Sequence, residues 1–288
     1  MLEFLQAPGA IVCASALVGL IVGSFLNVVI LRLPARLMHD WREQSREILE
    51  LTGESDSARP PGIVREPSHC PNCKHPLGIV ENIPVISWIA LRGRCRHCGA
   101  KISVQYPLVE LLTCVCSALI AWRFGFGWQT AAGLLLTWSL VALAGIDVRT
   151  QLLPDQITLP LLWLGLLAAL IPLFVATQAS ILGAAIGYLS LWSVYWLFKL
   201  TTGKEGMGYG DFKLLGALGA WMGPWALLPI VLLSSLIGAI VGGAALAFQG
   251  RDRATPIPFG PFLAAAGWVQ FVFGAEISHL YQRLFGLT

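Results

Sequence analysis

Long apolar stretches alternate with shorter polar segments along almost the whole chain. Each stretch carries few or no charged residues, and most have the roughly 20 residues that a helix needs to cross a bilayer. Backbone groups in lipid must bond one another, so we expect every stretch to form a helix. The eight stretches are residues 9–31, 104–122, 128–146, 157–175, 181–198, 212–223, 225–248 and 256–274.

The composition supports the same conclusion. Hydrophobic residues make up 56% of the chain and charged residues only 12%, against about 25% charged residues in an average soluble domain. So few charges cannot cover the surface of a water-soluble domain of this size. We therefore predict an all-α, polytopic membrane helix bundle with about eight transmembrane helices. The stretch 212–223 is short and ends before Pro224, so it predicts a tilted span or a broken helix facing a cavity.

The basic residues orient this bundle. With eight crossings and the N-terminus outside, only Arg123 and Arg283 of the 19 lysines and arginines fall on the outer side. The positive-inside rule makes the other side cytoplasmic. The basic residues are spread along membrane flanks, which predicts contact with membrane lipid and no nucleic-acid partner.

The polar and apolar segments predict a division of the chain. One long hydrophilic segment follows the first apolar stretch, and it begins with an amphipathic pattern over residues 35–50 that is typical of a surface helix. We expect a first transmembrane helix at residues 9–31 and a cytoplasmic loop at 32–103, with a cysteine module at 67–100. A transmembrane catalytic bundle at 104–275 and a C-terminal tail at 276–288 follow.

Four of the seven cysteines form two closely spaced pairs in the loop. Both pairs have the Cys-x-x-Cys spacing, and 21 residues separate them. Two such pairs supply four thiolates for a tetrahedral Zn²⁺ site, which is closed and therefore structural. The predicted metal ligands are Cys70, Cys73, Cys95 and Cys98.

Other uses of these residues are open. His69, His75 and His97 are nearby alternative ligands. Two disulfides or a redox pair would use the same cysteines, but a reducing cytoplasm disfavours lasting disulfides. Neither pair lies in a strand–helix pattern typical of thioredoxins, so zinc is the favoured interpretation.

Three acidic residues lie in or next to apolar stretches, where an ionisable group is costly and indicates function by default. Asp147 ends the third stretch and Asp211 begins the sixth, so the predicted topology places both at the cytoplasmic edge of the membrane. Glu110 lies farther inside the second stretch, and pairing with Lys101 or an interfacial arginine is an alternative to a functional role.

Two carboxyl groups at one depth suit an aspartic protease. Close carboxyls share a proton, so one can act as a base toward water while the other hydrogen-bonds the scissile carbonyl. Gly208 and Gly210 have no side chains, so an extended substrate backbone could approach Asp211 closely. A proton or ion relay is the main alternative for Asp147 and Asp211.

Missing motifs exclude other protease classes. The five histidines lie outside the apolar stretches, so a serine protease within the membrane would lack its base. The His-Glu-x-x-His pattern of a membrane metalloprotease is absent, as are the Asp-Thr-Gly and Asp-Ser-Gly loops of pepsin-like folds. Asp155 follows Pro154, and we expect it to be the N-cap of the fourth helix.

Gly208-Tyr209-Gly210-Asp211 matches the Gly-x-Gly-Asp motif of intramembrane aspartyl proteases. Together with further motifs in residues 19–34, 68–73, 82–88, 91–95, 102–110, 147–155 and 208–213, it resembles the pattern of the bacterial type IV prepilin peptidases (prepilin leader peptidase/N-methyltransferase). These motifs occur in the family's order, and the match runs over nearly the whole chain, with a variable stretch between Arg36 and Pro67.

This resemblance implies a bifunctional enzyme of the bacterial inner membrane, with its active site facing the cytoplasm. It would cleave the basic leader of type IV prepilins and type II secretion pseudopilins after a glycine, with Asp147 and Asp211 as the catalytic aspartates. It would then methylate the new N-terminal amine, commonly that of a phenylalanine, using S-adenosylmethionine. Lys213 completes the motif as a supporting residue, and we expect Glu110 and the zinc loop to lie near the methyl-transfer site.

Two other functions would use the same features. An ion-coupled transporter would employ the buried acids but would leave Gly208 and Gly210 without a role toward a substrate backbone. A non-catalytic membrane scaffold would dock a partner through the zinc loop and would tolerate Asp→Asn changes. The glycine-rich segment 206–210 follows no strand and is not a dinucleotide fingerprint, so the expectation of S-adenosylmethionine rests on the resemblance alone.

Overall fold

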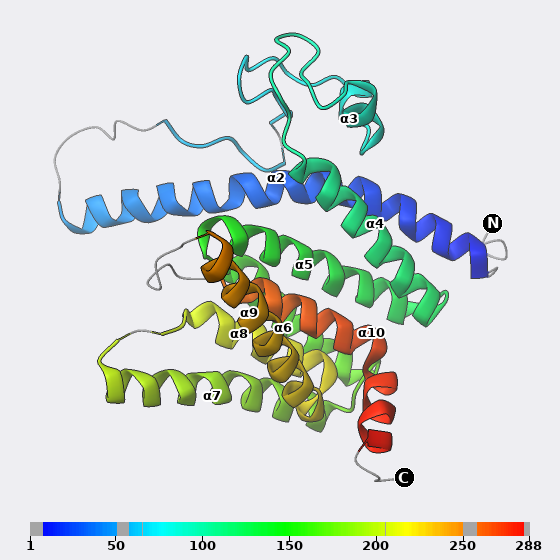
Figure 1. Cartoon of the computed structure of the whole chain (residues 1–288), viewed down its shortest axis with the longest axis vertical. Helices are drawn as coiled ribbons and strands as arrows, with labels where there is room; N and C mark the ends of the chain where they lie inside the picture. Colours follow the sequence, from blue (N-terminus) through cyan, green and yellow to red (C-terminus); the bar gives the residue numbers. More distant parts are fainter. Residues whose placement is uncertain (1–7, 51–57, 65, 205, 250–257, 285–288) are drawn as a thin grey trace. The chain divides into compact units, whose positions relative to one another are not determined.

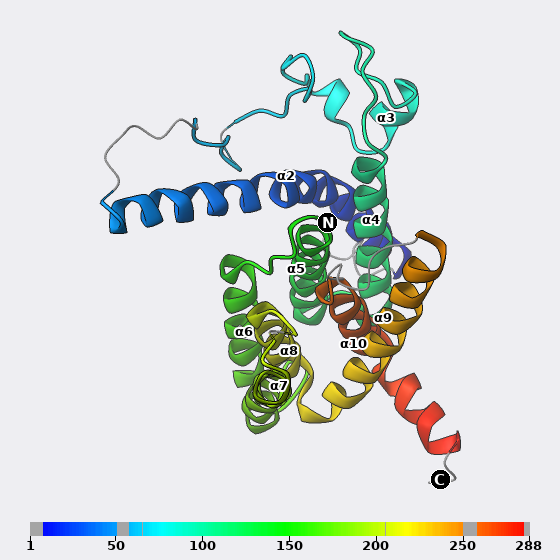
Figure 2. The ribbon, with the colours of Figure 1, turned by 60° about the vertical axis from the view of Figure 1, so that its left-hand side comes forward.

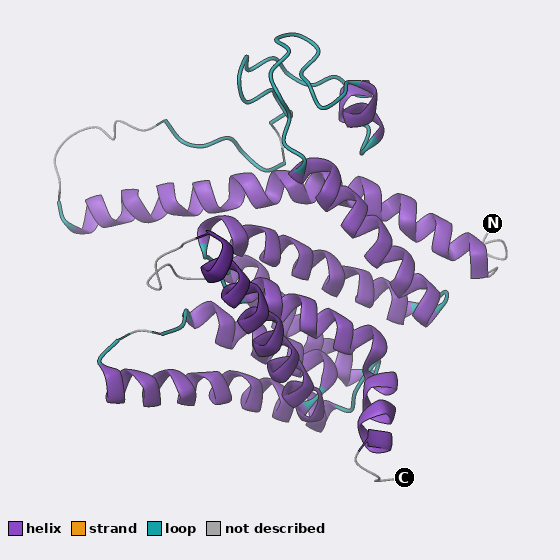
Figure 3. Cartoon of the chain, in the orientation of Figure 1, coloured by secondary structure: helices purple, strands orange, loops and turns teal. Residues whose placement is uncertain are grey.

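The computed structural model describes residues 8–50, 58–64, 66–204, 206–249 and 258–284 of the 288-residue chain. Within these ranges the regular structure is helical, and loops connect the helices (Figures 1 and 3). The longer helices are α2 (Pro8–Ile48), α4 (Gln105–Phe124), α5 (Trp128–Thr150), α6 (Asp155–Leu170), α7 (Thr177–Thr202), α8 (Tyr209–Met222), α9 (Leu227–Gln249) and α10 (Gly260–Leu284). The short elements are η1 (Val80–Asn82), α3 (Ile86–Ala90) and η2 (Pro224–Ala226).

Within the described residues, every predicted apolar stretch overlaps one of the longer helices, which confirms the all-α membrane class. Six of them, α2, α4, α5, α7, α9 and α10, are long and apolar enough to cross a membrane. The two others are shorter, with 16 residues in α6 and 14 in α8. At 1.5 Å per residue α8 is about 21 Å long, less than the ~30 Å of a hydrocarbon core.

The chain divides into two compact units, residues 1–125 and 126–288. The predicted division groups residues 104–122 with the bundle, whereas in the structure α4 packs along α2 in the N-terminal unit. Small residues allow this pairing: a Cβ at Gly19 would meet the Ser117 hydroxyl at 2.6 Å, and one at Gly23 would meet the Glu110 Cα at 2.7 Å. Close backbone approach of this kind is typical of helices that associate in lipid.

The helix α2 does not end where its apolar stretch ends. It continues through Pro34 to Ile48, so the predicted first transmembrane helix and the predicted surface helix at 35–50 form one continuous element (Figure 2). Charged residues such as Arg, Lys and Glu favour water over lipid, yet they have good helix propensity. The change in composition at residue 31 therefore marks a change of environment and not a helix end.

In the C-terminal unit, α8 is the buried centre. Apart from Lys213, all its residues from Asp211 to Trp221 are buried. The surrounding helices are α6, α7 and α10, and α8 lies beside α6 and α7 in Figure 2. A helix that is apolar all round belongs in a protein or membrane interior, and here neighbouring helices cover it.

Direct backbone contact fixes α8 against α7. A Cβ at Gly183 would fall on the carbonyl of Gly219, and a Cβ at Gly219 would fall on that of Gly183. The Ser180 hydroxyl donates to the carbonyl of Ala220 at 2.6 Å. On the side facing α6, the indole N–H of Trp221 donates to the carbonyl of Leu161 at 2.8 Å. The helix that begins at the Gly-x-Gly-Asp motif is therefore held on two sides.

Candidate active site and metal centre

Asp147 lies in the last turn of α5. Its own carbonyl accepts the N–H of Gln151 at 2.9 Å, and Gln151 adopts the left-handed conformation that ends the helix. The Asp147 residue is only 4% exposed. Its Oδ2 has no hydrogen-bond partner within the described residues. A buried carboxyl oxygen of this kind needs a donor.

Asp211 lies in the first turn of α8, three residues after Gly208, which is the residue preceding the helix. It is 7% exposed, and its carboxyl interacts electrostatically with that of Asp147. The positive end of a helix dipole favours an anionic group in the first turn. The structure thus brings together two buried carboxyls that are separated by more than 60 residues of sequence.

The two motif glycines have different surroundings. A Cβ at Gly210 would lie 2.7 Å from the Cβ of Leu153, so packing inside the protein explains why this position has no side chain. A Cβ at Gly208 would meet nothing within 4 Å. Of the two, Gly208 is the position at which an absent side chain leaves open space beside the α8 N-terminus.

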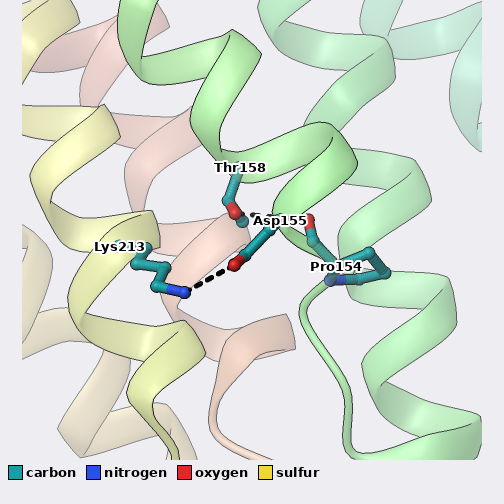
Figure 4. A network of polar contacts seen from close by, with 4 residues as sticks. All are labelled: Pro154, Asp155, Thr158 and Lys213. Carbon is teal, nitrogen blue, oxygen red and sulfur yellow. Dashed lines mark hydrogen bonds and ion pairs between the residues drawn. The ribbon is translucent and has the colours of Figure 1, made fainter. Parts of the chain in front are cut away.

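Lys213 forms an ion pair with Asp155 at the start of α6 (Figure 4). Its Nζ lies 2.6 and 2.8 Å from the two carboxylate oxygens. The prediction that Asp155 caps α6 is wrong, because Pro154 occupies the cap position and Asp155 is the first helical residue. The Pro154 carbonyl instead accepts from the Thr158 hydroxyl at 3.2 Å. The ion pair ties the beginning of α6 to the helix that carries Asp211.

Glu110 is buried in α4 and belongs to the N-terminal unit. Its Oε2 accepts the backbone N–H of Val85 at 2.7 Å, so a backbone donor satisfies the carboxyl in place of the basic partner that the sequence suggested. Val85 has φ +60°, a conformation that is rare for a β-branched residue. The Glu110–Val85 contact anchors the segment before α3 to a membrane helix.

The four loop cysteines form one cluster, as the spacing predicts. All four Sγ atoms lie within 4.8 Å of one another. Cys70 and Cys98 have a sulfur–sulfur distance of 3.8 Å, and Cys73 and Cys95 one of 4.0 Å. A tetrahedron with Zn–S bonds of about 2.3 Å has edges of about 3.8 Å. The cysteines are not disulfide-bonded, and their arrangement fits a four-thiolate zinc site.

The two cysteine pairs share one backbone design. In each, the first cysteine's N–H donates to a carbonyl five residues on (His75 and Ala100), and its carbonyl accepts from the residue four positions on (Lys74 and Gly99). Both residues that donate to the first cysteine's carbonyl have positive φ, +59° at Lys74 and +69° at Gly99. Two matching turns therefore present their thiols to a common point.

Hydrogen bonds favour the thiolate form of Cys98. The backbone N–H of Ala100 and the side-chain amide of Asn72 lower the pKa of Cys98 to about 6, and the amide nitrogen lies 3.7 Å from the sulfur. The rings of His75 and His97, two of the alternative ligands, lie against each other at a tilt of 36° with centroids 3.4 Å apart. Among the described residues, the group whose ligand atoms could hold a metal ion is that of the four cysteines.

The sequence pattern did not indicate that Gly260 is a neighbour of Asp147. Gly260, the first residue of α10, lies against the Asp147 carboxyl: a Cβ there would be 2.7 Å from Oδ2. The local signal is a Gly-Pro pair at the beginning of an apolar stretch, a pattern that helix starts share with many turns. Only the folded chain shows which side chain the glycine accommodates.

The chain is similar to known proteins over nearly its whole length. The bacterial peptidase A24 N-terminal domain matches residues 17–124, and the type IV leader peptidase family matches residues 134–243. The chain is 56% identical to a prepilin leader peptidase/N-methyltransferase from Xanthomonas campestris, over 98% of each chain. It is 51% identical to a protein of the same name from Pseudomonas aeruginosa, over 99% of each chain. No solved structure matches the chain.

The boundary between the two matched regions falls where the structure divides into its two units, between α4 and α5. Cys70–Cys98 and Glu110 lie in the first matched region, and Asp147 and Asp211 lie in the second. With relatives this similar over nearly its whole length, the chain belongs to the type IV leader peptidase family.

Proposed function

We propose that this protein is a bifunctional membrane enzyme that cleaves the leader of type IV prepilins and then N-methylates the new N-terminus with S-adenosylmethionine. The observation that carries the proposal is the pair of buried carboxyls, Asp147 and Asp211, in a member of this peptidase family. We further propose type II secretion pseudopilins as substrates. The enzyme would reside among the lipids of the bacterial inner membrane with these carboxyls facing the cytoplasm, as the distribution of basic residues indicates.

Proteolysis would use the two aspartates as a pair. The ionised carboxylate takes a proton from water as the water oxygen attacks the scissile carbonyl carbon, and the protonated partner donates its hydrogen to the carbonyl oxygen. Collapse of the resulting diol breaks the C–N bond: one diol hydroxyl returns its proton to the carboxyl that first acted as acid, and the leaving amine receives a proton from the carboxyl that first acted as base. The unpartnered Oδ2 of Asp147 is a suitable acceptor for the attacking water.

The substrate backbone would pass beside Gly208. This position has open space where a side chain would project, and it directly precedes the helix carrying Asp211. Gly210 and Lys213 would support the site from within, because Gly210 packs on Leu153 and Lys213 holds Asp155. These contacts position α8 and do not require either residue to touch the substrate.

The N-terminal unit would serve methyl transfer. The four cysteines would hold a structural Zn²⁺ that stabilises the loop, and Glu110 would anchor the loop to α4 through Val85. S-adenosylmethionine would supply the methyl group, and the new α-amine would accept it in place of a proton. We place this reaction near Glu110 and the zinc loop.

One assay tests both activities. Purified full-length protein is mixed with a leader-bearing pilin precursor and labelled S-adenosylmethionine, and leader release and methyl incorporation are measured separately. We expect Asp147→Asn to abolish leader release but to methylate pilin that was cleaved beforehand. Asp155→Asn is the matched control, because this nearby acid is in an ion pair and should leave cleavage largely intact. Cleavage by Asp147→Asn at the wild-type rate would refute the proteolytic assignment.

A second variant tests whether methyl transfer belongs to the N-terminal unit. Glu110→Gln should lower methylation of pre-cleaved pilin and leave leader release near the wild-type rate, since it loosens only the loop anchor. If this variant loses leader release and retains methylation, then Glu110 does not belong to the methyl-transfer half.

A further inference from the structure

The Asp147 carboxyl lies at the beginning of a third helix, α10. The carbonyl of Phe259 accepts the first helical hydrogen bonds, from Phe262 and Leu263 at 3.1 Å each, so Gly260 is the first residue inside the helix. The N–H at this position has no acceptor within its own helix. The Gly260 backbone lies directly against the carboxyl of Asp147, with which it interacts electrostatically.

Gly260 is the donor that the helix start makes available. The following residue is Pro261, which has no N–H, and Phe262 already donates to Phe259. An unpaired N–H at a helix N-terminus, together with the helix dipole, favours a carboxylate beside it. Asp147 is such a carboxylate, and it is 4% exposed.

Space is the second reason for glycine at this position. A Cβ on residue 260 would lie 2.7 Å from Oδ2 and 3.1 Å from Cγ of Asp147, and 3.1 Å from Cδ2 of Leu153. Gly260 does not have a left-handed φ, so an alanine could adopt its backbone conformation. An alanine Cβ would therefore displace the end of the Asp147 side chain and would not collide with a backbone segment.

We infer that Gly260 is a positioning residue for proteolysis: its N–H holds the Asp147 carboxyl, and its missing side chain admits that carboxyl beside the α10 N-terminus. The inference rests on the proposed function, since it concerns the same aspartate. The helix α10 packs on both α5 and α8. The element that orients Asp147 thus also contacts the helix carrying Asp211.

The test is Gly260→Ala in the full-length protein, with kcat and KM measured separately on a leader-bearing pilin precursor. Alanine should displace the carboxyl without changing the surface that binds substrate. Since a misplacement of about 1 Å can cost about 10²-fold in rate, we expect kcat to fall at least about tenfold while KM stays within about twofold of wild type. Gly243→Ala is the matched control, because a Cβ at Gly243 in α9 would meet nothing within 4 Å.

The melting temperature in detergent and methylation of pre-cleaved pilin together report whether each variant is folded. If Gly260→Ala lowers cleavage and methylation in parallel, or raises KM alone, or keeps the wild-type kcat, then the positioning role is refuted. An Asp147→Asn variant in the same series separates this result from the proposed function. If Asp147→Asn still cleaves, the catalytic assignment fails; if it is inactive while Gly260→Ala is fully active, only the inference about Gly260 fails.

Discussion

The two units hold their polar side chains by different means. In the C-terminal unit, Asp147 and Asp211 are buried among helices whose backbones touch, as at Gly183 and Gly219. In the N-terminal unit, only Cys70, Gly93 and Cys95 are buried between residues 66 and 101. The carboxyls thus depend on apolar packing, and the cysteines depend on turns and specific polar contacts.

The loop shows why such contacts are needed. The guanidinium of Arg32 donates to the carbonyls of Gly62, Glu66 and Pro67 at 2.6, 2.9 and 3.0 Å, which ties the chain before the cysteines to α2. Ile79 and Ile86 are exposed, so these apolar side chains form no core within residues 66–101. A bound Zn²⁺ would supply folding free energy that packing does not. Loss of metal should therefore affect the N-terminal unit, and substitutions that disturb helix packing should affect the C-terminal unit.

The largest loss of stability is expected from Gly183→Leu. Its side chain would fall on the backbone of α8, which cannot yield as a flexible side chain can, so the cost should be about 3 kcal/mol. The melting temperature in detergent and the cleavage rate should both fall. Gly243→Leu is the control, since that position faces open space. A Gly183→Leu protein with the wild-type melting temperature would show that close α7–α8 contact does not hold the acids.

Cys70→Ser should act on the loop alone. We expect loss of bound zinc, rapid proteolysis within residues 66–104 and reduced methylation, with leader release within a few-fold of wild type. Metal analysis and limited proteolysis measure these effects. Cys114→Ser, in the apolar stretch of α4, is the control that should retain zinc. If the protein without zinc kept its activity and its digestion pattern, the proposed structural role of the metal would be refuted.

The smallest effect is expected from Lys213→Met. The ion pair is partly exposed, with Asp155 at 49% and Lys213 at 27% side-chain exposure, so its loss should cost no more than about 1 kcal/mol. The cleavage rate should fall less than tenfold, and Lys213→Arg should restore most of it. A loss as large as that of Asp147→Asn would give Lys213 a direct role in the chemistry.

The helices were predictable because lipid requires long apolar segments, and the cysteine cluster because its spacing is local. Helix ends were less predictable: the composition changes at residue 31, but α2 continues to Ile48 because backbone hydrogen bonding does not stop where lipid does. The short stretch 212–223 remained ambiguous in sequence, since being apolar all round does not reveal that α6, α7 and α10 cover it.

The polar partners of the site were the least predictable part. Asp155 has the residue type and position of a helix cap, but it pairs with Lys213, 58 residues away. Gly260 precedes a proline as turn glycines often do, but it accommodates Asp147 from another helix. Such pairings depend on how helices pack, and local preference in one sequence does not contain that information.

The central claim is that Asp147 and Asp211 act as one unit in leader cleavage. Cleavage rates of Asp147→Asn, Asp211→Asn and the double variant, each normalised to methylation of pre-cleaved pilin, test it most directly. Residues that act together are not additive, so we predict that each single change lowers the rate by about 10³-fold or more and that the double change lowers it no further. A single variant that cleaves at close to the wild-type rate, or losses that multiply in the double variant, would contradict the account.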